Sequence, residues 1–228
     1  MKLTSQLKLI AASACLLVST ATMATPTNYS FAGSFTSDDN VQLFNFSANG
    51  SSSVALISYG YAGGTQVNGN VVARGGFDPI LALFNATTGV YIGQNDDTDV
   101  STCAGVSINT DGVTGFRWDT CYEAVLAAGN YTVAVMQFSN FANTPNLADG
   151  FENAGLGNFT AGYGCTNGSF CDVSDVAEGN NRTNRWAFDI LNVEAAIVVQ
   201  NDIPEPASIA LFGLALAGLG VSRRARKA

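Results

Sequence analysis

The feature that most constrains the fold of this chain is a series of short segments in which apolar and polar residues alternate. Gly, Asn, Asp and Ser residues separate these segments. A period of two, combined with aromatic and β-branched residues, favours strands over helices. Strands at such regular spacing predict an all-β fold, an antiparallel β-sandwich. The expected strands cover residues 29–35, 41–46, 54–59, 80–84, 90–93, 124–126, 131–138 and 186–193.

The N-terminal residues 1–24 have the pattern of a secretory signal peptide. Lys2 and Lys8 precede an apolar run at 9–18, and the small residues Thr22 and Ala24 follow it. This order predicts export and cleavage before Thr25. Cys15 lies inside the apolar run, so we do not expect it to be lipidated.

The C-terminal end carries a second pattern that is typical of a targeting signal. Pro204, Glu205 and Pro206 precede an apolar run at 207–221, and a basic cluster follows. Prolines resist helix formation and strand pairing, so this motif should stay accessible to a processing enzyme. The run predicts a single transmembrane helix at about 207–222, although about 22 Å of helix is short for a hydrocarbon core of about 30 Å. Cations behind the run would keep that end in the cytoplasm. They are Arg223, Arg224, Arg226 and Lys227.

This arrangement at the C-terminus resembles the PEP-CTERM sorting signal of biofilm-forming Gram-negative bacteria. The resemblance implies transient anchoring in the inner membrane, cleavage near Pro204–Pro206 by an exosortase, and delivery to the cell surface or the exopolysaccharide matrix. An ordinary tail anchor is the alternative. The expected organisation is a signal peptide at 1–24, a secreted domain at 25–201 and a sorting signal at 202–228.

The composition of the exported part limits the function classes. Residues 25–203 contain 17 acidic residues against four arginines and no lysine, which gives a net charge of −13. Such a surface repels nucleic acid and suits metal ions or neutral sugars as partners. The whole chain has no histidine, which excludes Ser-His-Asp and Cys-His relays and histidine-ligated metals. There is also no glycine-rich phosphate loop.

We therefore expect a protein that is not an enzyme. The enzyme class that survives is a glycosidase with two carboxylates about 5 to 10 Å apart. The sequence does not choose the pair among the available acids. These are Asp78, Asp96, Asp119, Glu123 and Glu152.

Four cysteines remain after export, and an even number in an oxidising compartment predicts two disulfides with three possible connectivities. The preferred pairs are the local ones, Cys103 with Cys121 and Cys165 with Cys171. A zinc site is the alternative, but the spacings do not match a zinc knuckle.

The clearest hairpin runs from Pro79 to Gln94. If Phe84 opposes Val90, Ile80 opposes Gln94 and Asp78 opposes Asp96. Carboxylates would then gather at one end of a sheet, and calcium is the candidate cofactor, because it takes six to eight oxygen ligands. Turn formation by Asn and Asp is the alternative. The candidate ligands are Asp78, Asn95, Asp96, Asp97 and Asp99.

Three stretches of the domain resemble the bacterial pre-peptidase C-terminal domain. They are residues 77–84, the Asn95-Asp96-Asp97 run after Gly89, and residues 126–133. The resemblance implies a secreted, accessory, jelly-roll-like β-sandwich. Residues 140–184 depart from it and predict an irregular edge strand or a disulfide-held loop. Aromatic residues there could form a sugar-binding face or fill the core. They are Phe141, Phe151, Phe159, Tyr163 and Phe170.

The function expected from these features is a non-catalytic surface or matrix protein that binds exopolysaccharide or calcium. A glycosidase acting on the matrix is the alternative. Ice binding is a further alternative, because PEP-CTERM tails also follow ice-binding domains, but the sequence has no Thr-x-Thr ladder.

Overall fold

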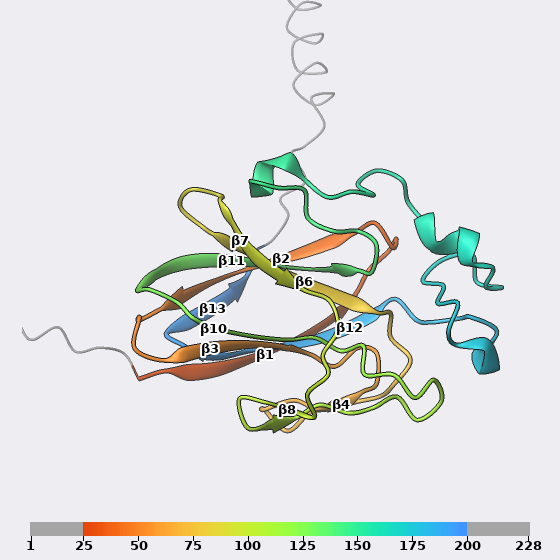
Figure 1. Cartoon of the computed structure of the whole chain (residues 1–228), viewed down its shortest axis with the longest axis horizontal. Coiled ribbons are helices and arrows are strands. Elements are labelled where there is room, and N and C mark those ends of the chain that lie inside the picture. The colour runs from red at the N-terminus through yellow and green to blue at the C-terminus, as the bar shows by residue number, and fades with distance from the viewer. Residues whose placement is uncertain (1–24, 200–228) are drawn as a thin grey trace, which may run out of the picture.

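The computed structural model describes residues 25–199, and the predicted signal peptide and sorting signal lie outside that range. Two antiparallel sheets pack face to face (Figure 1). The first has the order β1 (Thr27–Ser34), β12 (Arg185–Val193), β3 (Ser53–Ser58) and β10 (Cys121–Val125). The second has the order β13 (Ala195–Val198), β2 (Val41–Ala48), β11 (Gly129–Gln137), β6 (Pro79–Asn85) and β7 (Tyr91–Asn95).

Each strand expected from the alternation is present, and its bounds differ from the expected ones by a few residues. The strand β13 was not expected, because only one of its four residues is buried and the pattern is too short to detect. Two small ribbons were also not expected. They pair β4 (Gly64–Thr65) with β5 (Val71–Val72), and β8 (Thr102–Cys103) with β9 (Val106–Ser107).

The core lies between the two sheets and is rich in aromatic rings. Phe44 of β2 is fully buried, and its ring centroid lies 5.2 Å from that of Phe188 and 5.6 Å from that of Trp186, both in β12. Such tilted and edge-on pairs add to the stabilisation that burial alone provides. The aromatic residues of the alternating segments therefore hold the two sheets together.

The register of the hairpin β6–β7 corrects the expected one. Phe84 opposes Tyr91 rather than Val90, and a bulge follows, so that Ala82 rather than Ile80 opposes Gln94. The bulge adds one residue to β7, and the turn adds another. The total shift is two residues, which returns each side chain to the face that was expected. The expected cross-strand pair of Asp78 and Asp96 is therefore wrong as a register, although both residues still lie at the same end of the sheet.

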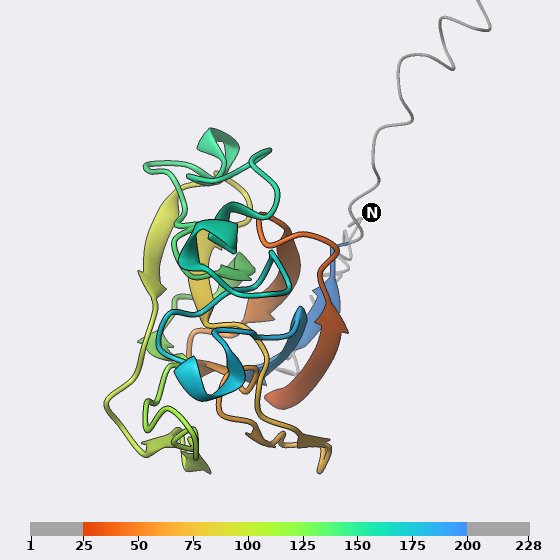
Figure 2. The same ribbon diagram turned by 90° about the vertical axis from the view of Figure 1, so that its right-hand side faces the viewer.

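The segment 140–184 runs along one end of the sandwich, where Figure 2 shows it facing the viewer. It contains three short 3₁₀ turns, η1 (Leu147–Asp149), η2 (Phe159–Tyr163) and η3 (Val176–Glu178). The disulfide between Cys165 and Cys171 lies within it, so the segment is the disulfide-held loop of the two expected forms.

The aromatic residues of this segment do not form one exposed face. Phe170 is buried in the core and stacks on Phe77 with 5.6 Å between ring centroids. Phe141 and Phe151 pack against a second apolar cluster, on the outer face of β6 and β11. Core filling accounts for these three residues, and half-buried Phe159 and Tyr163 remain in η2.

The second expected disulfide joins Cys103 to Cys121, with 5.9 Å between the Cα atoms. It connects the small β8–β9 ribbon to β10, an edge strand of the first sheet. In the chain-entropy model, a bond that closes a loop of this length stabilises the fold by about 3 kcal/mol.

Candidate functional site

Asp78 owes its position to a close crossing of three backbone segments just before β6. The amide of Gly76 donates to the carbonyl of Gly60 over 2.8 Å. A Cβ atom on Gly76 would lie only 2.4 Å from the carbonyl oxygen of Arg185, so no larger residue fits without a backbone shift. Two residues later, the carbonyl of Asp78 accepts from the amide of Phe138, also over 2.8 Å. The side chain of Asp78 is thus held at the end of the second sheet, where it is buried.

Asp96 and Asp97 follow the last residue of β7 and approach Asp78. One carboxylate oxygen from each of the three residues lies within 4.8 Å of the others. Asp78 is buried, Asp96 is half-buried and Asp97 is exposed. Among residues 25–199, no arginine forms an ion pair with any of the three. We call these residues the carboxylate cluster.

Burial and mutual repulsion make the ionised form of this cluster unfavourable. Burial raises the pKa of Asp78 well above its usual value, and the charges of Asp96 and Asp97 raise it further. Burial raises the pKa of Asp96 to about 6. Asp97 reaches solvent, but the protein around its carboxylate still removes part of its hydration. This desolvation, and to a smaller extent the charges of Asp96 and Asp99, raise the pKa of Asp97 to about 7. A bound cation would remove this repulsion.

Several oxygen atoms at this end of the sheet lack a hydrogen-bond partner within the described chain. They are Oδ1 of Asp78, Oδ1 of Asp96 and Oε1 of Gln137, all inaccessible to solvent. Gln137 is only 2% exposed and lines the same cavity as Asp78 and Asp97. Buried polar atoms are nearly always paired, so three unpaired acceptors around a carboxylate cluster point to a missing donor or cation.

A cavity of about 280 Å³ opens beside the carboxylate cluster. Aromatic side chains form much of its wall, and Trp118 is fixed by its neighbours. Its ring is parallel to that of Phe116 at 4.4 Å and lies 5.1 Å from that of Tyr61. The arrangement is a partly apolar pocket with carboxylates in its wall, which is the usual character of a small-ligand site. The lining residues are Asp78, Asp97, Trp118, Gln137, Phe138, Tyr163, Cys171, Asp172 and Val173.

Two of the five predicted calcium ligands lie outside the carboxylate cluster. Asn95 accepts through Oδ1 from the amide of Cys121 over 3.2 Å, so it connects the two sheets. Asp99 is exposed, and its backbone carbonyl accepts from Arg117 over 3.1 Å. Three carboxylates therefore remain together. Gln137, which the sequence analysis did not consider, lines the same cavity with an unpaired oxygen.

Three of the five carboxylates considered for a glycosidase, Asp119, Glu123 and Glu152, lie outside the carboxylate cluster. Asp119 is buried and accepts from Ser58 Oγ and the amides of Tyr61 and Ala62, so its oxygens are already engaged. Burial still raises its pKa to about 6, although these hydrogen bonds oppose the shift. Glu152 is exposed on the long segment. Among the described residues, Asp78 and Asp96 meet in the carboxylate cluster, and the charge of Asp119 also raises the pKa of Asp78.

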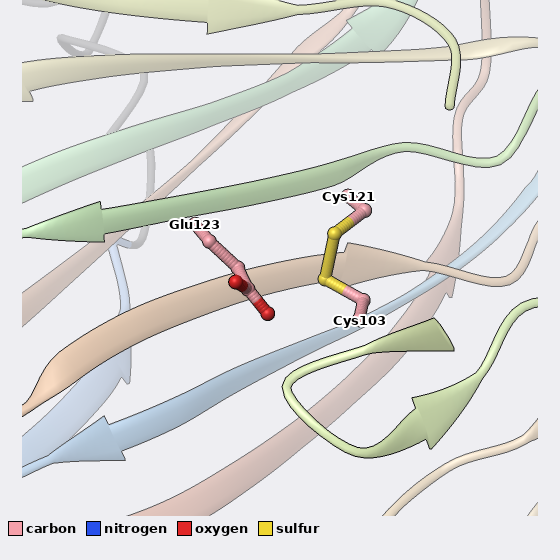
Figure 3. A group of neighbouring side chains, drawn as sticks. All are labelled: Cys103, Cys121 and Glu123. Atoms are coloured by element: carbon pink, nitrogen blue, oxygen red, sulfur yellow. A yellow bond between two sulfur atoms is a disulfide. The ribbon is translucent and has the colours of Figure 1, made fainter. Parts of the chain in front are cut away.

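Glu123 belongs to another group, which Figure 3 shows beside the Cys103–Cys121 disulfide. Its carboxylate accepts from the amide of Ala104. Because the two sulfur atoms are bonded to each other, they are not free thiolates, and thiolates are the form of cysteine that binds metals. This group is a disulfide with a neighbouring carboxylate.

An ionic network behind the cavity was not expected from the sequence. Arg182 is buried, and its guanidinium contacts Asp111 at 3.1 Å, Asp175 at 3.0 Å and Asp172 at 3.4 Å. The guanidinium also lies 3.7 Å from the centre of the Tyr61 ring. The sequence contains one indication of such a network, which is the small number of arginines in a very acidic domain. Each arginine there has many carboxylates with which it can pair.

Arg74 extends the network to the surface by contacting Asp111 and Asp175, both at 3.0 Å. Burial alone would raise the pKa of Asp111, but Arg74, the backbone amides of Val113 and Thr114, and Arg182 lower it. Asp172 belongs to both the network and the cavity wall, so the network fixes one side of the cavity.

Comparison with known families gives a match at the C-terminal end. Residues 202–227 match the PEP-CTERM protein-sorting motif. No curated protein is similar enough to this chain to be matched with it. Within residues 25–199, no helix is long and apolar enough to cross a membrane. The motif marks the chain as a secreted protein whose C-terminal sorting signal is membrane-anchored and is processed by an exosortase.

Proposed function

We propose that this protein is a non-catalytic component of the cell surface or the exopolysaccharide matrix, and that its β-sandwich binds calcium at the carboxylate cluster. The sorting motif supports the destination. The resemblance to the accessory pre-peptidase C-terminal domain, with its jelly-roll-like sandwich, supports the non-catalytic role. The observation that carries the metal site is the convergence of three carboxylates, two of which, Asp78 and Asp96, have an unpaired buried oxygen.

The donor set suits calcium better than other common metals. It consists of the carboxylates of Asp78, Asp96 and Asp97 and the amide oxygen of Gln137, which are all hard oxygen donors. Calcium accepts six to eight such ligands in flexible geometry, whereas magnesium requires a compact octahedron. The lack of histidine removes the ligand that zinc and iron sites most often use.

Calcium is expected to stabilise the exported protein against heat. A site with a dissociation constant near 10 μM would add about 2.7 kcal/mol at about 1 mM free calcium, which is a rise in Tm of about 5 to 10 °C for a domain of this size. The measurement is a melt of the exported, oxidised protein in EDTA, in calcium and in magnesium.

Two variants separate the metal site from general charge effects. D96N/D97N should lose the calcium-specific rise in Tm, because it removes two of the three carboxylates. D99N removes a neighbouring charge outside the carboxylate cluster and should retain the rise. A rise of equal size in magnesium, or one that survives in D96N/D97N, would contradict the proposed site.

The alternative function, a matrix glycosidase, is less well supported. The carboxylate oxygens of the cluster lie within 4.8 Å of one another, and three acids share the site. Glycosidase pairs are about 5 to 10 Å apart and act as one acid and one base or nucleophile. A short spacing among three acids suits a shared cation better. Release of reducing ends from a matrix polysaccharide by wild type but not by D78N would favour the glycosidase instead.

The proposed destination can be tested by following the C-terminus. In cells with an active exosortase, mass spectrometry of the surface or matrix fraction should find the protein without residues 208–228. Replacing Pro204, Glu205 and Pro206 by alanine should leave the uncut protein in the inner membrane. Uncut wild-type protein in the matrix fraction would contradict processing near this motif.

A further inference from the structure

We propose that the cavity beside the carboxylate cluster binds one ring of a neutral polysaccharide, and that two hydroxyl groups of this ring complete the coordination of the calcium ion. This inference rests on the proposed calcium site. It adds the class of ligand and the way in which the ion takes part in binding.

The first argument is the number of ligands. The described chain supplies side-chain oxygens from Asp78, Asp96, Asp97 and Gln137, whereas calcium takes six to eight oxygens. With one oxygen from each of these residues, about two to four positions on the ion stay open. Two members of the carboxylate cluster, Asp78 and Asp97, are also part of the cavity wall, so open positions on the ion can face the cavity. Neighbouring hydroxyl groups of a sugar are neutral oxygen donors that can fill two of them.

The second argument is the size and lining of the cavity. Its volume of about 280 Å³ is near the lower end for small-ligand sites and fits a single ring better than an extended chain. Phe138 and Tyr163 line it together with Trp118. The π faces of aromatic rings are negative and attract C–H groups, which cover the less polar face of a pyranose ring. The calcium ion would contact the hydroxyl groups of the sugar, and the aromatic rings of the cavity wall would contact its C–H groups.

The third argument is charge. Asp172 adds a further carboxylate to the cavity wall, and the exported part carries a net charge of −13 from four arginines and 17 acidic residues. A uronic acid or a sulfated sugar would meet repulsion on approach. The cavity therefore favours neutral sugars over anionic ones.

The test is affinity electrophoresis of the exported protein in gels that contain dextran, mannan or galactan, with hyaluronan as the anionic comparison. At least one neutral polysaccharide should retard the protein in 1 mM calcium and not in EDTA, and hyaluronan should not. Y163A removes an aromatic wall residue that is not a calcium ligand. It should raise the dissociation constant obtained from the retardation roughly tenfold, while the calcium-induced rise in Tm stays the same.

The control variant is L156A, which changes a 61%-exposed residue of the same segment that does not line the cavity. It should bind as wild type does. Retardation that is equal in EDTA, or no retardation by any of the three neutral polysaccharides, would overturn the inference while leaving calcium binding intact. A melt without any calcium response would instead show that the proposed metal site fails.

Discussion

Replacing Arg182 by methionine is expected to destabilise the domain by about 3 to 5 kcal/mol, because it leaves buried Asp172 without a cation and leaves Asp111 and Asp175 with only the half-buried Arg74. Asp111, Asp172 and Asp175 all contact the Arg182 guanidinium, and the side chain of Arg182 is 1% exposed. Methionine is of similar length, so the change removes charge more than volume. Urea unfolding of the exported protein at neutral pH would measure the loss.

Arg185 provides the matched control for this variant. It is exposed, and its guanidinium hydrogen-bonds only to Thr183 among the described residues. R185M removes the same charge from the same domain and should change the free energy of unfolding by less than about 1 kcal/mol. Equal losses in the two variants would show that net charge, and not the buried network, explains the effect.

Replacing Asp38 by alanine is expected to destabilise the domain by about 2 to 6 kcal/mol and to loosen the segment 140–184. Asp38 is fully buried, and it accepts from the amide of Phe159 and from both the amide and the hydroxyl of Thr160. Each buried donor that loses its partner costs about 1 to 3 kcal/mol, and both donors of Thr160 are buried. Urea unfolding gives the free energy, and limited chymotrypsin digestion reports the local opening.

The neighbouring Asp39 serves as the control for this prediction. Its carboxylate accepts from one amide, that of Gly155, at an exposed position. D39A should cost less than about 1 kcal/mol and should not increase cleavage within the segment. If chymotrypsin cleaves D38A no faster than D39A, Asp38 does not anchor the segment. The anchor matters for function because Tyr163, at the end of η2, lines the proposed sugar cavity.

The strands were predictable because their signal is local. Residues 54–59 and 131–138 are short runs rich in apolar, β-branched and aromatic residues, and β3 and β11 form there with both faces buried. The preferred disulfide pairs were also local, and both are present. The hairpin register was missed because a bulge in β7 does not change the apolar pattern.

The site was predictable only in part. The sequence placed Asp78 and Asp96 at one end of a sheet because they flank the two strands of a hairpin. It gave no means of separating Asp96 and Asp97, which join the carboxylate cluster, from Asn95 and Asp99, which do not. That choice depends on the packing of β7 against β10 and not on the order of residues.

The sequence by itself determined the C-terminal sorting motif, the strand positions, the local disulfides and the lack of histidine chemistry, since each depends on short-range pattern or on composition. The tertiary structure decided which side chains share a cavity. Trp118, Gln137 and Tyr163 meet Asp78 there, and Arg182 pairs with Asp111, 71 positions away. Such contacts form only when distant loops close onto the end of the sandwich. The free energy that fixes them comes from the packing of the whole domain, which a local pattern does not contain.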